Sequence, residues 1–251
     1  MKIFTTQQTK VQKAIAILLW VAVWQVLAMA IGEKIIIVSP IEVLEEILHS
    51  LGDKVFWINI GYSTSKVIGG FISGTIIGVL FAILANRFNL VRILLEPLFQ
   101  SIKTVPVVSF IIILLFFIKN FYLPIIISTL IVLPITYFNV LNALLNIDKR
   151  FLTIAHLYNF SYGKKLKYIF IPAVKKSLWG TFKSTAGLAW KSSLAAEVIA
   201  IPKYGMGKEI LQGKLYLETE KVFAYTFVAI ILSLLMEKIL LSFGGKYENR
   251  N

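Results

Sequence analysis

The sequence predicts an all-α integral membrane protein with about six transmembrane helices. Apolar residues make up 57% of the 251 residues and charged residues only 16%, and the mean hydropathy is +0.78. Soluble domains contain about 45–50% apolar and about 25% charged residues. The apolar residues gather in runs long enough to cross a bilayer, which takes about 20 residues per helix. These runs leave no room for a soluble domain, so we predict a single transmembrane domain over residues 1–251.

Composition and motifs exclude several other classes. The net charge of +13 could indicate a nucleic-acid partner, but a chain this apolar must first satisfy the bilayer, so we expect no nucleic acid. Because the chain has no cysteine, neither disulfides nor thiol-bound metals are available, and we predict no metal site. Gly207-Lys208 is followed by Glu209 rather than by Ser or Thr, so it is no phosphate loop. We predict a protein that is not an enzyme and that has no ATPase site of its own.

The first apolar run covers residues 14–31 and ends at Ala28-Met29-Ala30. Lysines precede it, as they precede the core of a signal peptide, but the run is longer than a typical signal core. We therefore favour an uncleaved span. Beyond it, Ser39-Pro40 predicts the start of a short helix with Pro in its first position. Apolar residues at helical spacing alternate with glutamates there, which indicates an amphipathic helix at the membrane surface or against the bundle.

Spans two to four are predicted within residues 62–145. The second span, 62–85, places Gly70, Gly74 and Gly78 four residues apart. A glycine face of this kind lets another helix approach closely, so we interpret it as a surface for helix packing.

An inner loop at 86–96 is expected to lead to span three at 98–118, and a tight outer turn to span four at 122–145. Pro106 and Pro134 lie inside these two spans. Prolines within spans kink helices and free backbone carbonyls, which suits a protein that changes shape but also occurs in static bundles.

Residues 147–183 form a polar, basic segment between two apolar runs, and Asp148 is its only acid. Short loops rich in Lys and Arg stay on the cytoplasmic side, and the predicted inner side carries roughly twice as many of them as the outer side. We therefore predict that this segment and both termini are cytoplasmic. Its aromatic and aliphatic residues recur at helical spacing, which predicts a folded docking surface for a soluble partner.

Residues 178–243 are expected to hold spans five and six. Four lysines fall inside or at the edges of predicted spans, namely Lys66, Lys103, Lys191 and Lys238. Three intramembrane charges are considered further: Lys66, Lys191 and Glu197. A charge near the bilayer centre costs roughly 3 kcal/mol or more, so each should face protein or water, and all three are candidates for a solute pathway. Our hypothesis is that Lys191, with Ser192 or Ser193, lines the pathway and attracts an anion. The alternative is that Lys191 pairs with a carboxylate or extends to the membrane surface.

The basic segment resembles the cytoplasmic loop of bacterial ABC importer permeases, the binding-protein-dependent transport inner-membrane component family. That family's signature is Glu-Ala-Ala, three residues, Gly, and a later Ile-x-x-Pro-like ending. Ala155 and Pro172 match it, whereas Thr153, Ile154 and Asn159 depart from it. Asn tolerates a left-handed turn better than most residues, so Asn159 could serve where the family has Gly, and Thr153 could cap a helix.

A second resemblance narrows the group. Residues 187–200 read GLAWKSSLAAEVIA and are followed by Pro202, Gly205 and Gly207. This stretch is similar to the span-five region of permeases of the nitrate, sulfonate and taurine type. With Ser39-Pro40 and Leu95-Glu96-Pro97, the resemblance covers most of the chain.

The resemblance implies the permease fold of an ABC type I importer in the plasma (inner) membrane of a bacterium. Two permease copies, in the simplest case a homodimer, would form the pathway for a small anion that an extracytoplasmic substrate-binding protein delivers. ATP would be used by a separate ATPase subunit, and no cofactor would be bound directly. The coupling loop would include seven residues that contact or position the ATPase: Thr153, Ile154, Ala155, His156, Asn159, Gly163 and Pro172.

A self-sufficient secondary transporter or channel is the alternative from another class. It would need carboxylates within its spans to couple ions, and only Glu197 is a candidate. It would also need no docking loop. A membrane enzyme ranks behind both, because no catalytic residues cluster in the sequence.

Overall fold

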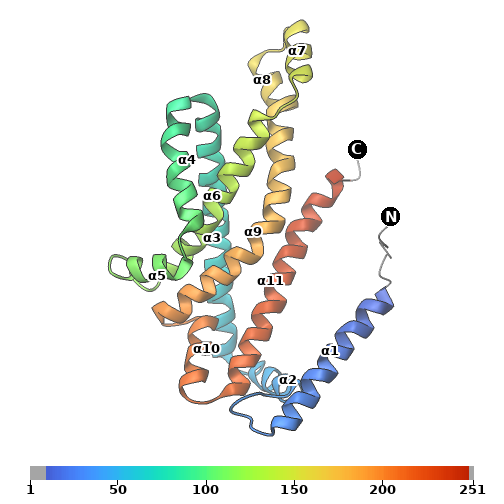
Figure 1. The fold of residues 1–251 in the computed structure, drawn as a ribbon, viewed down its shortest axis with the longest axis vertical. Helices are drawn as coiled ribbons and strands as arrows, with labels where there is room; N and C mark the ends of the chain where they lie inside the picture. The colour runs from blue at the N-terminus through green and yellow to red at the C-terminus, as the bar shows by residue number, and fades with distance from the viewer. Residues whose placement is uncertain (1–9, 249–251) are drawn as a thin grey trace. The chain divides into compact units, whose positions relative to one another are not determined.

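A computed structural model describes residues 10–248, and every regular element in that range is helical (Figure 1). The all-α prediction is therefore confirmed. The helices are α1 Lys10–Ile31, α2 Pro40–Ser50, α3 Lys54–Arg87, α4 Asn89–Thr104, α5 Val107–Leu115, α6 Leu123–Leu145, α7 Lys149–Leu157, α8 Tyr162–Lys165, a π-helix at Leu166–Phe170, α9 Ile171–Ala200, α10 Met206–Leu215 and α11 Thr219–Glu248.

Several helices are long and apolar enough to cross a membrane. Four qualify alone, namely Ala14–Ile31, Lys54–Arg87, Leu123–Leu145 and Thr219–Ser242, and the pair α4–α5 makes a fifth if it is counted as one bent span. The predicted fifth span falls on α9, which is a continuous helix of 30 residues. Its lysines and Glu197 keep it outside the set defined by length and hydropathy.

The prediction for residues 86–118 was wrong in two respects. The expected inner loop at 86–96 is mostly helical, because α4 already begins at Asn89. The expected third span at 98–118 is broken, since α4 and α5 meet at an angle of 101°. Pro106 lacks an N–H, and the residue before a proline is driven out of the helical region. Val105 accordingly has ψ 134°.

Contacts divide the chain into two compact units, which we describe separately. One unit holds the described residues up to Trp57 together with Glu209–Val228. In it, Trp24 donates a hydrogen bond to the Val38 carbonyl at 3.0 Å, and its ring stacks on Phe223 with centroids 5.9 Å apart.

Helix α2 of this unit begins where the sequence predicts, with Ser39 as its N-cap and Pro40 in the first turn. Ser39 and Glu42 form a capping box, in which each side chain satisfies a backbone N–H of the other residue. The Lys34 ammonium lies 2.8 Å from the Glu42 carboxylate. This contact and the Ser39 donors lower the pKa of Glu42 to about 2, so the cap is ionised at neutral pH.

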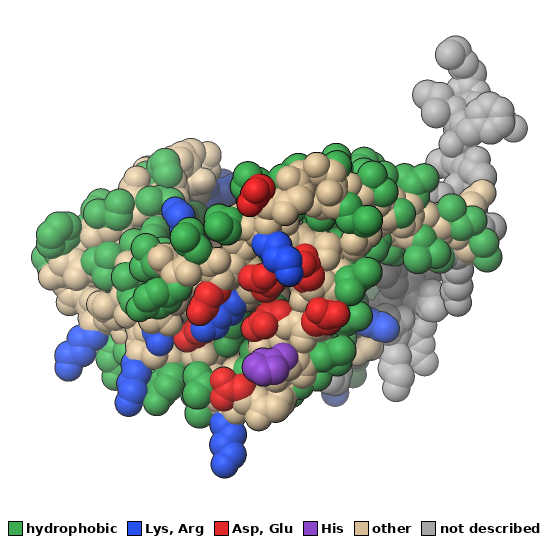
Figure 2. All heavy atoms as spheres, turned by 90° about the horizontal axis from the view of Figure 1, so that it is seen from below, with side chains coloured by type: hydrophobic (Ala, Val, Ile, Leu, Met, Phe, Trp, Pro, Cys, Tyr) green, Lys and Arg blue, Asp and Glu red, His purple; other side chains and the backbone are tan. Residues whose placement is uncertain are grey.

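More than half of the 13 acidic residues belong to this first unit. Figure 2 shows acidic side chains gathered on the face seen from below. The acids of the unit are Glu33, Glu42, Glu45, Glu46, Asp53, Glu209, Glu218 and Glu220. Charge is therefore divided along the chain, because the basic segment 147–183 belongs to the other unit.

The second unit holds Ile58–Lys208 and the described residues from Ala229 onward. Within it, α3 lies close against α6 along the glycine face. A Cβ atom added at Gly70, Gly74 or Gly78 would lie within 3.0 Å of α6 atoms in each case. The contacted α6 residues advance from Ile125 to Thr136 as α3 advances, so the two helices run parallel here. Only glycine permits two backbones to approach this closely.

Candidate functional site

The first candidate site is the α7 segment, residues 148–161, which leads from α6 to α8 and lies beyond the end of α6 and the start of α9 (Figure 1). Asp148 is the N-cap of α7, and its carboxylate accepts a hydrogen bond from the Arg150 N–H at 2.9 Å. The expectation that Thr153 caps a helix was wrong. Thr153 lies within α7, where its hydroxyl donates to the Lys149 carbonyl at 3.0 Å.

The α7 segment reverses direction at Asn159, whose φ is +49°. The Phe160 N–H donates to the Ala155 carbonyl at 2.8 Å, and the Asn159 N–H donates to the His156 carbonyl at 3.0 Å. These two bonds define a Schellman motif, in which the residue after the C-cap takes a left-handed conformation. Asn159 thus has the conformation predicted for it, and it occupies the position where glycine is usual.

Replacing Asn159 tests this turn. We expect Asn159→Gly to leave the end of α7 intact and Asn159→Val to destabilise it by about 1–2 kcal/mol, because a bulky residue resists positive φ. Hydrogen exchange at the Asn159 and Phe160 amides measures the difference. Equal exchange rates in the two variants would contradict the assignment of the motif.

The side chains of α7 divide sharply in exposure. Ala155 is 1% exposed, whereas Leu157 is 72% exposed and Tyr158 75% exposed. Further apolar side chains on α7 are exposed as well, namely Phe151, Leu152 and Ile154, as is His156. The α7 segment therefore presents an apolar surface within basic surroundings.

The last two residues predicted for this region lie in two later helices, α8 and α9. Gly163 is in α8, where no atom lies within 4 Å of the position that a Cβ would occupy. Pro172 is in the first turn of α9, directly after the π-helix, where its missing N–H is tolerated.

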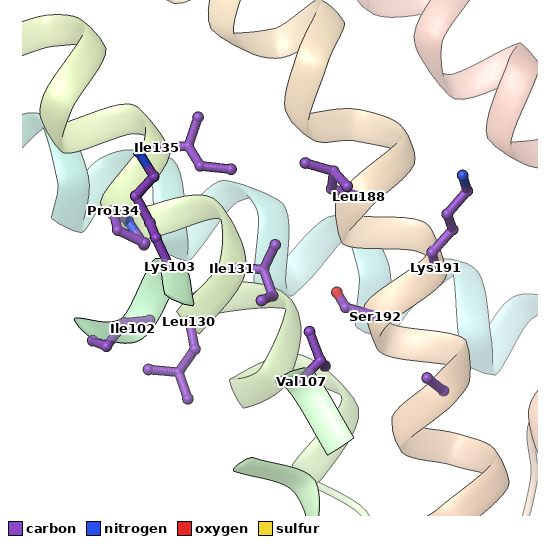
Figure 3. A pocket seen from close by; sticks show the side chains of 11 residues that line it. Ile102, Lys103, Val107, Leu130, Ile131, Pro134, Ile135, Leu188, Lys191 and Ser192 are labelled. Carbon is purple, nitrogen blue, oxygen red and sulfur yellow. The ribbon is translucent and has the colours of Figure 1, made fainter. Parts of the chain in front are cut away.

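The second candidate site is a cavity of about 380 Å³ between α4, α5, α6 and α9 (Figure 3). It contains two of the predicted pathway residues, Lys191 and Ser192. Figure 3 shows the Ser192 hydroxyl directed from α9 toward the cavity, while the Lys191 side chain extends away with its ammonium group outward. The other lining residues are Ile102, Lys103, Val107, Leu130, Ile131, Pro134, Ile135, Leu188 and Ala195.

Both lysines at the cavity lack a carboxylate partner in the described part of the chain. Lys191 is exposed and forms no ion pair there, so the alternative that it pairs with a carboxylate finds no support. The Lys103 ammonium lies 5.0 Å from the centroid of the Phe138 ring. Sequence reasoning placed Lys103 within a span without giving it a role. Its signal was the same as that of Lys191, a lone lysine in an apolar run.

Glu197 is fully buried, away from the cavity lining. Its carboxylate accepts hydrogen bonds from the Ser63 hydroxyl at 2.7 Å and from the Gly207 N–H at 2.9 Å. The Ser63 hydroxyl oxygen in turn accepts from the Met206 N–H at 2.8 Å, and Asn59 accepts from the Gly205 N–H at 3.0 Å. These bonds form what we call the Glu197 clamp, which joins α3, α9 and residues 205–207.

The remaining predicted pathway residues are also buried rather than at the cavity. Lys66 is 5% exposed, and its ammonium group lies 3.1 Å from the centroid of the Phe121 ring. Ser193 is fully buried, and its hydroxyl has no hydrogen-bond partner within the described residues. Of the five predicted pathway residues, the structure therefore brings only Lys191 and Ser192 to the cavity.

Comparison with protein-family models assigns the chain. The model of the binding-protein-dependent transport system inner membrane component matches residues 74–243, which is well over half of the chain. The chain belongs to this family. Its members are membrane permease components of ABC transporters that work with ATPases and substrate-binding proteins, and they share the ABC type I permease fold. The family predicted from residues 153–172 and 187–200 is thus confirmed.

Individual relatives of this family agree with the assignment. A putative aliphatic sulfonates transport permease of Bacillus subtilis is 22% identical over 91% of this chain and 86% of its own length. A probable ABC transporter permease of Brucella melitensis biotype 1 is 22% identical over 82% of this chain and 84% of its own. A nitrate import permease of a Synechocystis species is 30% identical over 38% of each chain.

Proposed function

We propose that this chain is the pathway-forming subunit of an ATP-driven importer in a bacterial plasma membrane, with both termini in the cytoplasm. Two copies would form the pathway, and a separate ATPase would dock on the α7 segment and drive it. An extracytoplasmic binding protein would deliver the solute, which is a small anion of the sulfonate or nitrate class. The solute class follows the names of two relatives, a sulfonate and a nitrate permease.

The observation that carries the proposal is the exposed apolar surface of α7. Leu157 and Tyr158 are both more than 70% exposed at the tip of the α7 segment, although the capped helix and the Asn159 turn hold that tip rigidly. Exposed apolar groups on an ordered tip mark a contact with a protein or a membrane, and the proposed cytoplasmic position of this basic segment favours a protein. A rigid tip can also transmit displacement to α9 through α8 and the π-helix that follow it.

Co-purification of the ATPase tests the proposal. The tagged chain is extracted in mild detergent from its native membranes, and proteins that accompany it are identified by mass spectrometry. We expect an ATPase with a phosphate loop to accompany the unaltered chain and to be lost from Leu157→Asp, because a carboxylate in an apolar contact must be desolvated. Leu215→Asp is the matched control, since Leu215 is 67% exposed and lies at the end of α10.

Two results would contradict the proposal. The first is retention of the ATPase by Leu157→Asp at the level of Leu215→Asp, which would place docking elsewhere. The second is recovery of the chain as a stable oligomer that transports its solute without ATP, which would instead favour a secondary transporter or channel.

A further inference from the structure

We infer that the cavity between α4, α5, α6 and α9 is a binding subsite for a small amphiphilic anion, whose apolar body lies inside and whose charged head lies at the rim. The inference rests on the proposed function, because it specifies the kind of solute that the pathway accepts. It goes further in that it distinguishes an organic anion with an apolar body from a bare inorganic oxyanion such as nitrate.

The walls of the cavity are mostly apolar, which suits an apolar ligand body. Eight of its lining residues have aliphatic side chains or are proline, and they come from all four helices. Ser192 contributes the one hydroxyl of the lining, and this hydroxyl already donates to the Ala189 carbonyl at 3.1 Å. A nitrate ion inside would lose its hydration with almost no compensating hydrogen bonds, which is costly. An aliphatic or aromatic body would instead lose contact with water favourably.

Two lysines, Lys103 and Lys191, supply positive charge at the cavity. Lys103 and Lys191 both line the cavity, and both are exposed without an ion-pair partner among the described residues. Figure 3 shows both ammonium groups directed away from the interior of the cavity. Lysine stems commonly cover apolar surface while the ammonium group reaches a polar environment. Both ammonium groups are thus outside the apolar interior, where a sulfonate, carboxylate or phosphate group could accept their hydrogen bonds.

The start of α5 supplies a further positive contribution. Val107, the first residue of α5, lines the cavity. Because Pro106 precedes it as N-cap, no side chain caps the N-terminus of this nine-residue helix. Uncapped N–H groups and the helix dipole favour negative charge at such an end. Two lysines and a helix N-terminus on one cavity therefore select an anion.

The volume of the cavity limits the size of the ligand's apolar body. Its volume of about 380 Å³ lies at the lower end of the range for small-molecule sites, roughly 300–1,000 Å³. This accommodates an alkyl chain of several carbons or one aromatic ring. The same chemistry belongs to a small alkanesulfonate and to the end of an anionic lipid, and the two sources are distinguished below.

Direct binding to the full chain tests the inference. The purified protein is placed in nanodiscs of phosphatidylcholine alone, and the dissociation constants of hexane-1-sulfonate, nitrate and hexan-1-ol are measured by calorimetry. We expect hexanesulfonate to bind at least about tenfold more tightly than either of the others. It alone has both an alkyl chain for the apolar walls and a charged group for the lysines. Lys103→Met and Lys191→Met should each weaken it by about tenfold, as expected for one charge-assisted hydrogen bond.

Two further variants give the control and the steric test. Lys183→Met removes an exposed lysine of α9 that does not line the cavity, and it should leave binding unchanged. Ala195→Leu fills part of the cavity. It should weaken the binding of hexanesulfonate while leaving the folded protein intact.

The outcomes separate the sources of the ligand. If hexanesulfonate fails to bind but phosphatidylglycerol co-purifies with the unaltered chain and is lost from both Met variants, the subsite holds and its occupant is a lipid. Equal affinities for nitrate and hexanesulfonate, or binding of neither sulfonate nor anionic lipid, would overturn the inference. Since the isolated chain is used, these outcomes are independent of whether the ATPase docks on α7.

Discussion

Gly70→Ala is expected to destabilise the protein by about 3 kcal/mol, at the upper end of the cost of overpacking a core. The new Cβ would lie 2.4 Å from Cβ of Ser128 and 2.7 Å from the carbonyl oxygen of Ile125. One of these atoms belongs to the α6 backbone and cannot move aside alone, so the two helices must separate. Thermal unfolding of the purified protein, followed by size-exclusion fluorescence, measures the effect.

Gly69→Ala is the matched control for this prediction. The adjacent position has only the end of the Ile125 side chain near it, at 3.9 Å, which is ordinary contact. We expect no loss of stability and a gain of up to about 1 kcal/mol, because alanine is the better helix former. If Gly70→Ala were as stable as Gly69→Ala, the close approach of α3 and α6 would be ruled out.

The second large effect is expected at the Glu197 clamp. Glu197→Ala removes the acceptor for the Ser63 hydroxyl and for the buried Gly207 N–H. An orphaned buried donor costs about 1–3 kcal/mol, and the lost side chain leaves a cavity as well. We expect a total loss of about 3 kcal/mol in the free energy of unfolding, together with increased hydrogen exchange at the Gly205, Met206 and Gly207 amides.

Glu197→Gln separates the roles of shape and hydrogen bonding. Its amide oxygen can still accept from Ser63 and Gly207, so most of the stability should remain. Glu45→Ala, a change at an exposed glutamate of α2, should have almost no effect. Normal exchange at residues 205–207 in Glu197→Ala would show that the clamp does not hold this turn.

Local patterns predicted local features well. The Ser39-Pro40 start of α2, the left-handed Asn159 and the exposed, folded α7 segment all follow from rules that act within a few residues. Membrane-length runs gave the helical class for the same reason, because the bilayer requires each span to satisfy its own backbone.

Features that depend on contacts between distant residues could not be predicted from the sequence. Pro134 lies inside an unbroken α6, whereas Pro106 separates two helices at 101°, and the residues flanking each proline do not distinguish the two cases. Glu197 looked like a pathway residue because a charge in a span is costly. Its partner Ser63 is 134 positions away, so the clamp becomes visible only when the helices are placed in space.

Helix α9 joins the features described above into one mechanical part. At about 1.5 Å per residue, its 30 residues extend roughly 45 Å. They begin after α8 and the π-helix, which follow the α7 segment, carry Ser192 at the cavity wall and include Glu197 near their end. A displacement of α9 near Pro172 would therefore move the cavity wall at Ser192 and the Glu197 clamp together. In the proposed importer, access on the two sides of the membrane would be switched by one rigid lever rather than by two independent gates.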